Sequence, residues 1–456
     1  MYVSNLALND FRSYREVVLA FEPGITVFVG ENGQGKTNLV EAIGYLSTFS
    51  SHRVAADAAL VRQGASAGVV RAKVVRGVSP VTLELEIIAG KANRARINRG
   101  NARPRDLLGL VRTVMFAPED LELVKGDPGD RRAFLDDLMV QFRPRLAAVK
   151  AEYEKVLRQR GALLKHLQKA KRRGTEPDTS TLSVWDAQLV KFGAQIVAAR
   201  AEIVAGLRPF VADYYELVSG GKGHARIDYE ANVDKRTGYT LPEPLQLADP
   251  AVANAVAEHE GALADVGAVS ELLTQALAEH RSAEIERGVN LVGPHRDDLR
   301  LTLGTLPAKG YASHGESWSY ALALKLGMWR LLRTHESGEW ADSAEPILIL
   351  DDVFAELDSR RRERLAAIVA HAEQVFVTAA VGDDLPPSLA GARFVVAGGT
   401  VTSADAGARV ASMPADVAGA AGTDGVVSAG GNFTRGQAEP KVEGASESAE
   451  EGDGDE

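Results

Sequence analysis

Residues 30 to 37 read Gly30-Glu31-Asn32-Gly33-Gln34-Gly35-Lys36-Thr37, which matches the pattern G-x-x-x-x-G-K-[ST]. The apolar run Ile25 to Val29 precedes them, and apolar residues at helical spacing follow from Leu39 to Leu46. Strand, glycine loop and helix in this order form a phosphate-binding loop, whose backbone N–H groups close around phosphates at a helix N-terminus. Lys36 is then expected to reach the β- and γ-phosphates, and the Thr37 hydroxyl to coordinate Mg²⁺. We therefore predict that residues 30–37 bind the phosphates of a nucleotide.

An acidic partner for the metal follows far downstream, at the end of Ile347-Leu348-Ile349-Leu350-Asp351-Asp352. Four apolar residues that end in two carboxylates are typical of a Walker B strand. Asp351 is expected to hold Mg²⁺, directly or through water. Asp352 is expected to orient or activate the attacking water. The predicted catalytic residues are therefore Asp352 and Lys36, and the predicted metal ligands are Thr37 and Asp351.

Between these two halves lies Tyr311-Ala312-Ser313-His314-Gly315-Glu316-Ser317, at the head of a predicted helix. Alone, Ser-x-Gly-Glu is a weak pattern that also fits an ordinary helix cap. Together with the two elements above it indicates an ATP-binding-cassette signature, in which Ser313 and Gly315 meet the γ-phosphate held by a second subunit. The strand Gln374 to Thr378 ends where transporter-type cassettes carry a switch histidine, so we expect Thr378 to sense the γ-phosphate by its hydroxyl. The expected ligands are ATP and Mg²⁺.

The composition describes a globular chain of 456 residues with 45% apolar residues and no cysteine, which excludes disulfides and thiolate metal sites. The N-terminus lacks a signal-peptide pattern and no run has the length of a membrane span, so we expect a cytoplasmic protein without a membrane partner. From Gly398 onward we count 3 Lys/Arg and 11 Asp/Glu, a net of −8, against −2 for the residues before it. This acidic, Gly/Ala/Ser-rich tail is expected to be disordered, and a solubilising role is favoured over partner binding.

The segment from Arg131 to Arg173 carries 13 Lys/Arg against 4 Asp/Glu, a net of +9. Apolar residues from Leu146 to Leu167 follow a heptad pattern that only Arg160 interrupts, and a second seam ends at Pro209. The breaker between them, residues 174–178, predicts that the two helices fold back as an antiparallel coiled-coil arm. We favour contact of its basic helix with nucleic-acid phosphates over a merely soluble helix.

Alternating apolar residues predict strands on both sides of the phosphate loop. A hairpin is expected over residues 2–21 with Arg12 in its turn, where Arg12 either touches nucleotide or, as we favour, is an ordinary surface arginine. Further strands are expected between Gly68 and Asn98. From Lys91 to Arg112 seven basic residues accompany one acidic residue, which fits a phosphate-contacting ribbon and a solvated hairpin equally well.

At this point the sequence closely resembles the RecF family, bacterial DNA replication and repair ATPases related to SMC-type proteins. The resemblance spans residues 1–397 and rests on residues 30–37 and on motifs elsewhere: Pro118 to Pro128, Arg131-Arg132, Phe134-Leu135-Asp136, Leu157-Arg158-Gln159-Arg160, Gly293-Pro294-His295-Arg296-Asp297-Asp298, Leu350-Asp351-Asp352 and Glu356-Leu357-Asp358. The chain departs from the family at Ser317-Trp318, where a glutamine and an arginine are usual.

The resemblance implies an α/β fold: a P-loop ABC-type ATPase head of two lobes with an inserted antiparallel helical arm. The predicted domains are the head with Walker A (1–130), the arm (131–287), the head with signature and Walker B (288–397) and the disordered acidic tail (398–456). It also implies ATP-dependent homodimerisation and binding of single-stranded, gapped or junction DNA. Partners RecR and RecO, recombinase loading and a part in the SOS response follow from the same resemblance. Because the carboxylate after the metal ligand is Asp352, one methylene shorter than the glutamate of many fast cassette ATPases, we expect ATP hydrolysis to be slow. The expected activity is therefore a weak, DNA-stimulated ATPase.

Rival functions come from other classes of protein. A transporter-type cassette ATPase would have a shorter insertion and a switch histidine, and the basic arm and Thr378 argue against it. A small GTPase needs an N/T-K-x-D motif downstream, and none is found. A non-hydrolysing, ATP-gated DNA scaffold remains an alternative, because slow hydrolysis and no hydrolysis give the same sequence pattern.

Overall fold

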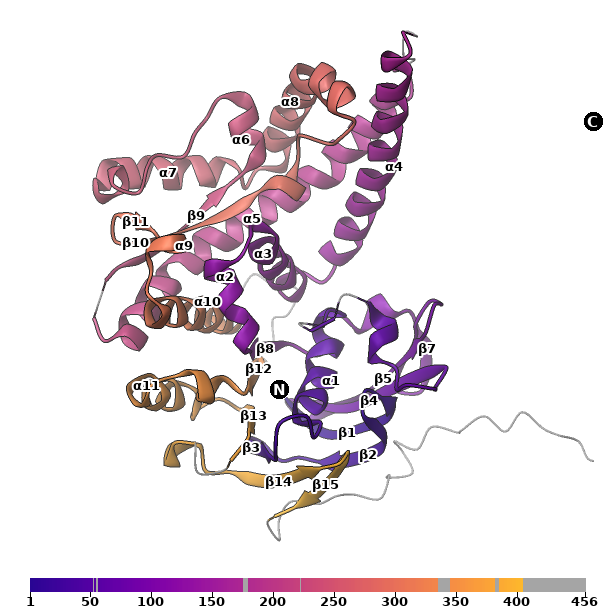
Figure 1. Cartoon of the computed structure of the whole chain (residues 1–456), viewed down its shortest axis with the longest axis vertical. Coiled ribbons are helices and arrows are strands. Elements are labelled where there is room, and N and C mark those ends of the chain that lie inside the picture. The colour runs from indigo at the N-terminus through magenta and orange to yellow at the C-terminus, as the bar shows by residue number, and fades with distance from the viewer. Residues whose placement is uncertain are drawn as a thin grey trace, which may run out of the picture. The chain divides into compact units, whose positions relative to one another are not determined.

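The strand before the phosphate loop lies inside a largely parallel sheet of the computed structural model. The structure describes residues 1–404 except 52, 55, 175–178, 222, 335–344 and 382–384. In spatial order the strands of this sheet are β15 (Thr400–Ser403), β14 (Ala392–Ala397), β3 (Gly24–Val29), β13 (Gln374–Ala379), β12 (Ile347–Asp351) and β8 (Thr113–Phe116) (Figure 1). Only β14 and β15 pair antiparallel. The carboxyl ends of β3, β13, β12 and β8 therefore share one edge of the sheet.

Both faces of the parallel sheet are covered, which explains its uninterrupted apolar runs. On β3, Phe28 packs into one hydrophobic core and its neighbour Val27 into another. On β12, Ile347 and Ile349 belong to the first core and Leu348 and Leu350 to the second. The alternation follows from the two-residue period of a strand.

The first core lies between the parallel sheet, helix α1 (Lys36–Thr48) and an antiparallel sheet. Its strands are ordered β2 (Tyr14–Ala20), β1 (Tyr2–Phe11), β4 (Ala67–Arg76), β5 (Ser79–Ile88), β6 (Arg94–Ile97) and β7 (Gly100–Ala102). The predicted hairpin over residues 2–21 is confirmed as β1 and β2, with Arg12 in the turn. The strands expected between Gly68 and Asn98 are confirmed as β4, β5 and β6.

The second core belongs to a helical lobe, drawn above the sheets in Figure 1. Its helices are α2 (Glu122–Lys125), α3 (Pro128–Phe142), α4 (Leu146–Arg172), α5 (Leu182–Ser219), α6 (Asn232–Thr237), α7 (Pro250–Ala262), α8 (Val266–Arg287), α9 (Ala308–Tyr311) and α10 (His314–Thr334). A small antiparallel sheet of β9 (Ala225–Glu230), β10 (Asp298–Leu303) and β11 (Leu306–Pro307) packs with them. Helix α11 (Ser359–Val369) follows β12. None of the helices in the described part of the chain combines the length and apolarity that a membrane span requires.

The two helices predicted from heptad seams exist as α4 and α5, and they pack against each other. The predicted end of the second helix at Pro209 is wrong, because α5 continues to Ser219 with Pro209 inside it. Proline removes one backbone hydrogen bond. The helix continues because Leu207 and Val211, on either side of Pro209, lie against α10, where Gly327 lets the two helices approach closely. The breaker that was predicted at residues 174–178 lies largely outside the described residues.

Arg160, the interruption in the first seam, is fully buried. Its guanidinium donates to Asp186 of α5 at 2.8 Å, to Asn290 at 2.7 Å and to Glu284 of α8. A buried charge is tolerated only when it is paired and hydrogen-bonded. The residue that breaks the apolar pattern thus joins three segments of the helical lobe.

The boundaries at 130 and 287 remain predictions, and all the described residues belong to one compact unit. The predicted disordered tail begins too early, because Thr400–Ser403 form strand β15 on the edge of the parallel sheet. Val401 is buried there and gives the strand an apolar contact. The average composition of residues 398–456 did not indicate this contact. The remaining tail, residues 405–456, lies outside the described residues.

Candidate nucleotide site

The phosphate loop joins the end of β3 to the start of α1. Gly35 caps the helix with a φ of 112°, and a Cβ there would lie 2.9 Å from the hydroxyls of Ser13 and Tyr14. A Cβ on Gly30 would lie 2.1 Å from the carbonyl oxygen of Val396. Both positions therefore require glycine, for backbone conformation and for close approach. The Tyr14 hydroxyl donates to the Gly35 carbonyl at 3.1 Å and ties the first hairpin to the loop.

Lys36 is buried and its ammonium group is turned into its own loop. It donates to the carbonyl oxygens of Gly30 at 2.7 Å and Glu31 at 3.2 Å, and to the Asn32 side chain at 3.4 Å. These are neutral acceptors. A buried ammonium satisfied only by dipoles gains from an anion nearby, since charge-assisted bonds are the stronger ones.

The end of β12 brings two hydroxyls to one carboxylate. Asp351 Oδ1 accepts from Thr37 Oγ1 at 3.0 Å and from Thr378 Oγ1 at 2.7 Å. The parallel register pairs Asp351 with Thr378 across β12 and β13, and β13 lies next to β3, which leads into the phosphate loop. Strand order therefore assembles residues that are more than 300 positions apart in the chain.

Asp352 turns the chain away from the sheet with a φ of 51° and a ψ of 16°. Its backbone N–H donates to Thr378 Oγ1 at 2.9 Å, so that one hydroxyl orients both aspartates. Burial raises the pKa of the Asp352 carboxyl, Asp351 adds to this effect, and the Lys36 ammonium opposes it. The charges of Lys36 and Asp352 thus attract each other across the loop.

The residues present fit a magnesium nucleotide. Carboxylate and hydroxyl oxygens are ligands that Mg²⁺ prefers, and Asp351 and Thr37 lie within hydrogen-bond distance of each other. The first N–H groups of α1 have no partner inside the helix, and Gly35 offers no side chain to cap them. Gly33 has a φ of 82° and open space around it. Gln34 is less free, because its Oε1 accepts from the Gly398 N–H at 2.7 Å.

The signature residues lie at the N-terminus of α10, where Ser313 is exposed and Gly315 is half-buried. Ser313 and Glu316 cap the helix reciprocally, Ser313 N–H to Glu316 at 2.8 Å and Glu316 N–H to Ser313 Oγ at 3.3 Å. Among the described residues, the hydrogen bonds of Ser313 go to Glu316 and Ser317 and not to the phosphate loop. The structure therefore does not join Ser313 and Gly315 to Lys36 within one chain.

Arg361 of α11 links the signature helix to the segment after the Walker B strand. Its Nε donates to Ser319 Oγ at 2.9 Å, and Ser319 donates to the Gly315 carbonyl at 3.0 Å. Its Nη1 pairs with Asp358. A Cβ on Gly315 would lie 2.9 Å from this guanidinium, which would have to move to make room for it.

The departure Ser317-Trp318 lies on the inner side of α10. Ser317 is buried and donates to the Ser313 carbonyl at 2.9 Å, and Trp318 is buried in the helical lobe. Neither side chain is therefore exposed at the N-terminus of the helix.

Sequence reasoning missed three contacts of the site. Tyr14 supports Gly35, Thr378 bridges two aspartates, and Arg12 pairs with Glu41 of α1 through Nε at 2.8 Å. Arg12 was expected to be an ordinary surface residue, but its partner Glu41 is buried. The positive φ of 52° at Arg12 marks a strained turn, and no periodicity in the sequence signals it.

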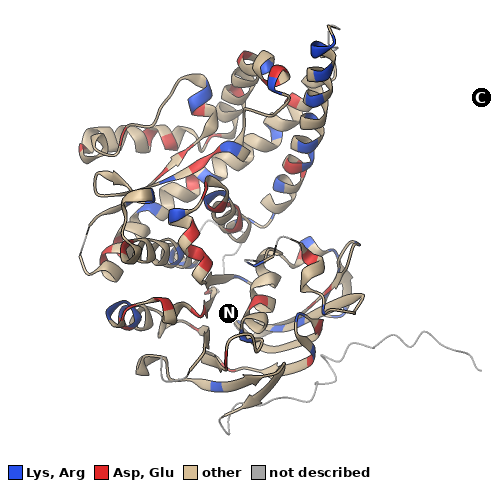
Figure 2. Ribbon diagram, viewed as in Figure 1, with Lys and Arg blue, Asp and Glu red and all other residues tan. Residues whose placement is uncertain are grey.

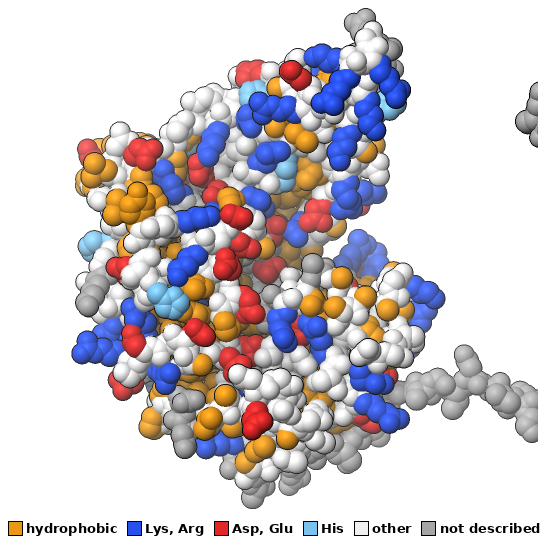
Figure 3. Space-filling model, in the orientation of Figure 1, with side chains coloured by type: hydrophobic (Ala, Val, Ile, Leu, Met, Phe, Trp, Pro, Cys, Tyr) orange, Lys and Arg blue, Asp and Glu red, His pale blue; other side chains and the backbone are white. Residues whose placement is uncertain are grey.

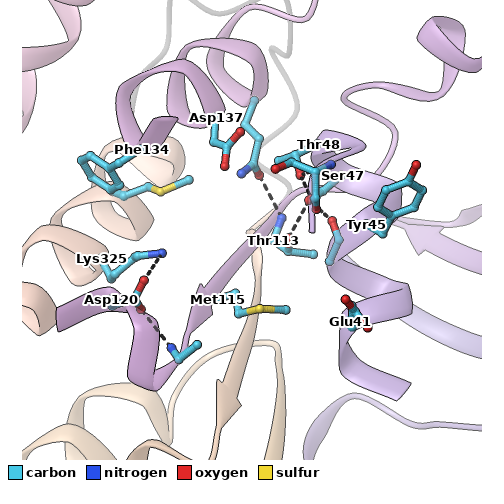
Figure 4. A pocket seen from close by; sticks show the side chains of 15 residues that line it. Glu41, Tyr45, Ser47, Thr48, Thr113, Met115, Asp120, Phe134, Asp137 and Lys325 are labelled. Atoms are coloured by element: carbon cyan, nitrogen blue, oxygen red, sulfur yellow. Dashed lines mark hydrogen bonds and ion pairs between the residues drawn. The ribbon is translucent and has the colours of Figure 1, made fainter. Parts of the chain in front are cut away.

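A cavity of about 110 Å³ lies behind the phosphate-loop helix, between α1, β8, α3 and α10 (Figure 4). Lys325 of α10 pairs there with Asp120 at 2.8 Å, and Ser47 of α1 bonds Thr113 of β8 at 2.7 Å. The carboxylate of Asp137, from α3, points into the cavity. Burial raises the pKa of Asp137 to about 6, although Lys325 and Lys150 lower it. Ala117 to Asp120 leave the parallel sheet at the edge that carries Asp351. The cavity therefore lies at the junction between this sheet and the helical lobe.

Comparisons with known proteins agree with this fold. Residues 2–384 match the family described as RecF/RecN/SMC N terminal domain. The DNA replication and repair protein RecF of Beutenbergia cavernae is 58% identical over 405 residues, which cover 88% of this chain and 99% of that protein. RecF of Streptomyces avermitilis is 53% identical over 403 residues, with 88% and 99% covered. Among solved structures, the recombination mediator protein RecF-ATPrS in the RecFOR pathway has a TM-score of 0.74 at 25% identity and covers 89% of this chain and 98% of its own.

Proposed function

The chain belongs to the RecF family of DNA replication and repair proteins, and from this membership we propose that it is an ATP-gated, DNA-binding homodimer. One observation carries the proposal. The hydroxyls of Thr37 and Thr378 converge on Asp351 at the N-terminus of α1, which is a composite of three distant segments suited to ATP and Mg²⁺.

In the proposed site, Gly30, Glu31, Asn32, Gly33, Gln34 and Gly35 surround the phosphates with backbone N–H groups. Lys36 leaves its loop carbonyls for the phosphate oxygens, and Thr37 and Asp351 hold the metal, which neutralises phosphate charge. Asp352 orients the attacking water. Thr378 keeps Asp351 and Asp352 in place through its hydroxyl and takes the position from which the γ-phosphate is sensed.

The site is completed by a second copy of the chain. Ser313 is exposed at a helix N-terminus, where partial positive charge and a hydroxyl favour an anion. Its own chain offers it no contact with the phosphate loop among the described residues. Gly315 lies two residues further along the chain, packed against Arg361. We propose that both residues meet the γ-phosphate bound by the partner head, so that ATP joins two heads.

DNA is proposed to bind along α4. The helix carries no Asp or Glu after Glu154, and Lys165, Lys169, Lys171 and Arg172 are exposed on it. Figure 2 and Figure 3 show Lys and Arg gathered along this helix. Gapped or junction DNA is the proposed substrate. RecR and RecO as partners, recombinase loading, the SOS response and a cytoplasmic location are proposed from family membership.

ATP hydrolysis is proposed to be slow and to release the dimer from DNA. The water-orienting carboxylate is an aspartate, one methylene shorter than the glutamate of many fast cassette ATPases, and catalysis depends on near-attack geometry.

The proposal is tested by analytical ultracentrifugation of the full chain with ATP, ADP or no nucleotide, each with and without gapped duplex DNA. A dimer that forms with ATP and Mg²⁺ but not with ADP, and that binds gapped DNA more tightly than the monomer, is expected. A chain that stays monomeric in every condition contradicts the composite site. An ATP-bound dimer on DNA without any phosphate release identifies the non-hydrolysing scaffold instead.

A further inference from the structure

The geometry points to a docking site for an acidic peptide segment of a partner protein at the base of the arm. A groove of about 440 Å³ lies between residues 157–165 of α4 and the loop 288–296, and we refer to it as the arm-base groove. The inference goes beyond the proposed function, which concerns ATP and DNA, and Lys165 belongs both to this groove and to the proposed DNA-binding face of α4.

The rim of the arm-base groove is positively charged. Arg158 and Lys165 project from α4 and Arg296 from the opposite loop, and no lining residue is Asp or Glu. Within the described part of the chain, Arg158 and Lys165 make no hydrogen bond or ion pair, and Arg296 donates through Nε to the Asn290 carbonyl at 2.7 Å. His295 adds no charge, because burial lowers its pKa to about 4. Cations that lack carboxylate partners favour an acidic ligand.

The floor of the groove is aliphatic. Leu157 is half-buried, Ala162 is exposed, and Val289 keeps 38% of its surface accessible. None of the lining residues has an aromatic side chain on which a nucleobase can stack, apart from the imidazole of His295, which is engaged by the Tyr153 hydroxyl at 2.8 Å. Binding of single-stranded nucleic acid relies on such stacking. An apolar floor beneath a cationic rim instead suits a peptide that presents carboxylates together with a large apolar side chain.

The walls of the groove are held together from below by the Arg160 network. Arg160 donates to Asn290 Oδ1 at 2.7 Å, and Asn290 Nδ2 donates to the Leu157 carbonyl at 3.0 Å. Gly161 faces Asn290 so closely that a Cβ would lie 3.2 Å from its amide nitrogen. The helix wall and the loop wall are therefore fixed before a ligand arrives, and such preorganisation lowers the cost of binding.

The site is tested by fluorescence anisotropy with the full chain and a short labelled peptide of aspartates around a single leucine. Ala162→Trp fills the floor without changing charge, and Arg158→Gln removes a rim cation. Arg172→Gln, on the same helix beyond the groove, is the matched control. Each groove variant is expected to weaken peptide binding by roughly tenfold, a loss typical of a residue central to an interface. The control variant is expected to bind as tightly as the wild type.

Three results would overturn the docking site. Equal losses in Arg158→Gln and Arg172→Gln would show non-specific attraction to a basic helix. Unchanged peptide binding in Ala162→Trp would show that the apolar floor does not contact the peptide. If Ala162→Trp instead lost binding of a short single-stranded oligonucleotide while peptide binding was unaffected, the groove would be reassigned to nucleic acid. Ala162 and Arg158 are exposed, so folding is checked by the melting temperature, which should not change.

Discussion

Asp352 is the residue on which the proposed timing of the ATP cycle depends. Its left-handed backbone conformation is one that Asp and Asn tolerate, so Asp352→Asn changes the carboxylate and leaves the backbone unstrained. The variant is expected to bind ATP, to hydrolyse it on the order of 100-fold more slowly because the water is no longer oriented, and to remain longer on DNA. Single-turnover hydrolysis and DNA dissociation are measured side by side for both proteins.

Two further variants serve as controls for this prediction. Lys36→Ala is expected to abolish nucleotide binding, and Asp351→Asn to weaken metal binding while the loop stays intact. Equal hydrolysis rates in wild type and Asp352→Asn would remove Asp352 from the mechanism. DNA dissociation that is much faster than hydrolysis in the wild type would refute the release timer.

Asp137 makes stability depend on pH through the cavity behind the phosphate-loop helix. Burial raises its pKa from 3.8 to about 6 in the folded chain, so the folded state binds more protons between these values. This contribution to stability therefore falls as pH rises from 3.8 to about 6 and is fully lost above that range. Asp137→Asn is expected to raise the melting temperature above the folded-state pKa and to change it little at acidic pH. Asp213→Asn, on the exposed face of α5, is the matched control, and an equal gain in both would contradict the prediction.

Helix α4 is the element expected to carry DNA affinity. Replacing Lys165, Lys169, Lys171 and Arg172 with glutamine removes exposed cations and no ion pair that the structure shows. DNA binding should weaken alike on all sequences, and the log–log salt slope should fall by roughly one unit for each lost phosphate contact. Binding isotherms over a series of salt concentrations measure the slope. An unchanged slope would assign this face to solvent or to a protein partner.

The hairpin of β6 and β7, with the residues that follow it, is a second basic segment whose arginines are partly paired with carboxylates. Arg96 pairs with Glu84 at 3.1 Å, Arg94 with Glu86 at 3.7 Å and Arg103 with Asp106 at 3.3 Å. Because these charges are partly neutralised by carboxylates, changing Arg94, Arg96, Arg103 and Arg105 to glutamine is expected to lower the salt slope less than the α4 changes do. An equal or larger decrease would identify the hairpin as a phosphate-contacting ribbon.

At the scale of the whole molecule, the composite site makes dimerisation depend on Ser313. Ser313→Asp keeps a helix-capping side chain but places a negative charge where the partner's γ-phosphate is proposed to lie. The variant should bind ATP as the wild type does and fail to dimerise. Ser313→Asn preserves the cap without the charge and should dimerise more readily than Ser313→Asp. The bulkier Ser313→Arg should also lose dimerisation. Sedimentation with ATP and Mg²⁺ distinguishes these outcomes, and normal dimerisation of Ser313→Asp and Ser313→Arg would refute the shared site.

The local elements of this protein could be predicted from the sequence because each has its own short-range pattern. The glycine loop before Lys36, the apolar strand before Asp351 and the alternating hairpin over residues 2–21 depend on conformational preferences and periodicities within a few residues. The heptad pattern likewise predicted α4. These signals established the α/β class and the residues that form the two halves of the nucleotide site.

What only the tertiary structure decided is which distant residues meet. Thr378 bridges Asp351 and Asp352 because strand order puts β13 between β3 and β12, and no local periodicity encodes that order. Arg160, which the pattern shows as an interruption, is buried because carboxylates from α5 and α8 surround it. Helix α5 passes through Pro209 because its flanking turns are packed against α10. In each case the free energy comes from burial and pairing between segments far apart in the chain, which override the local preference.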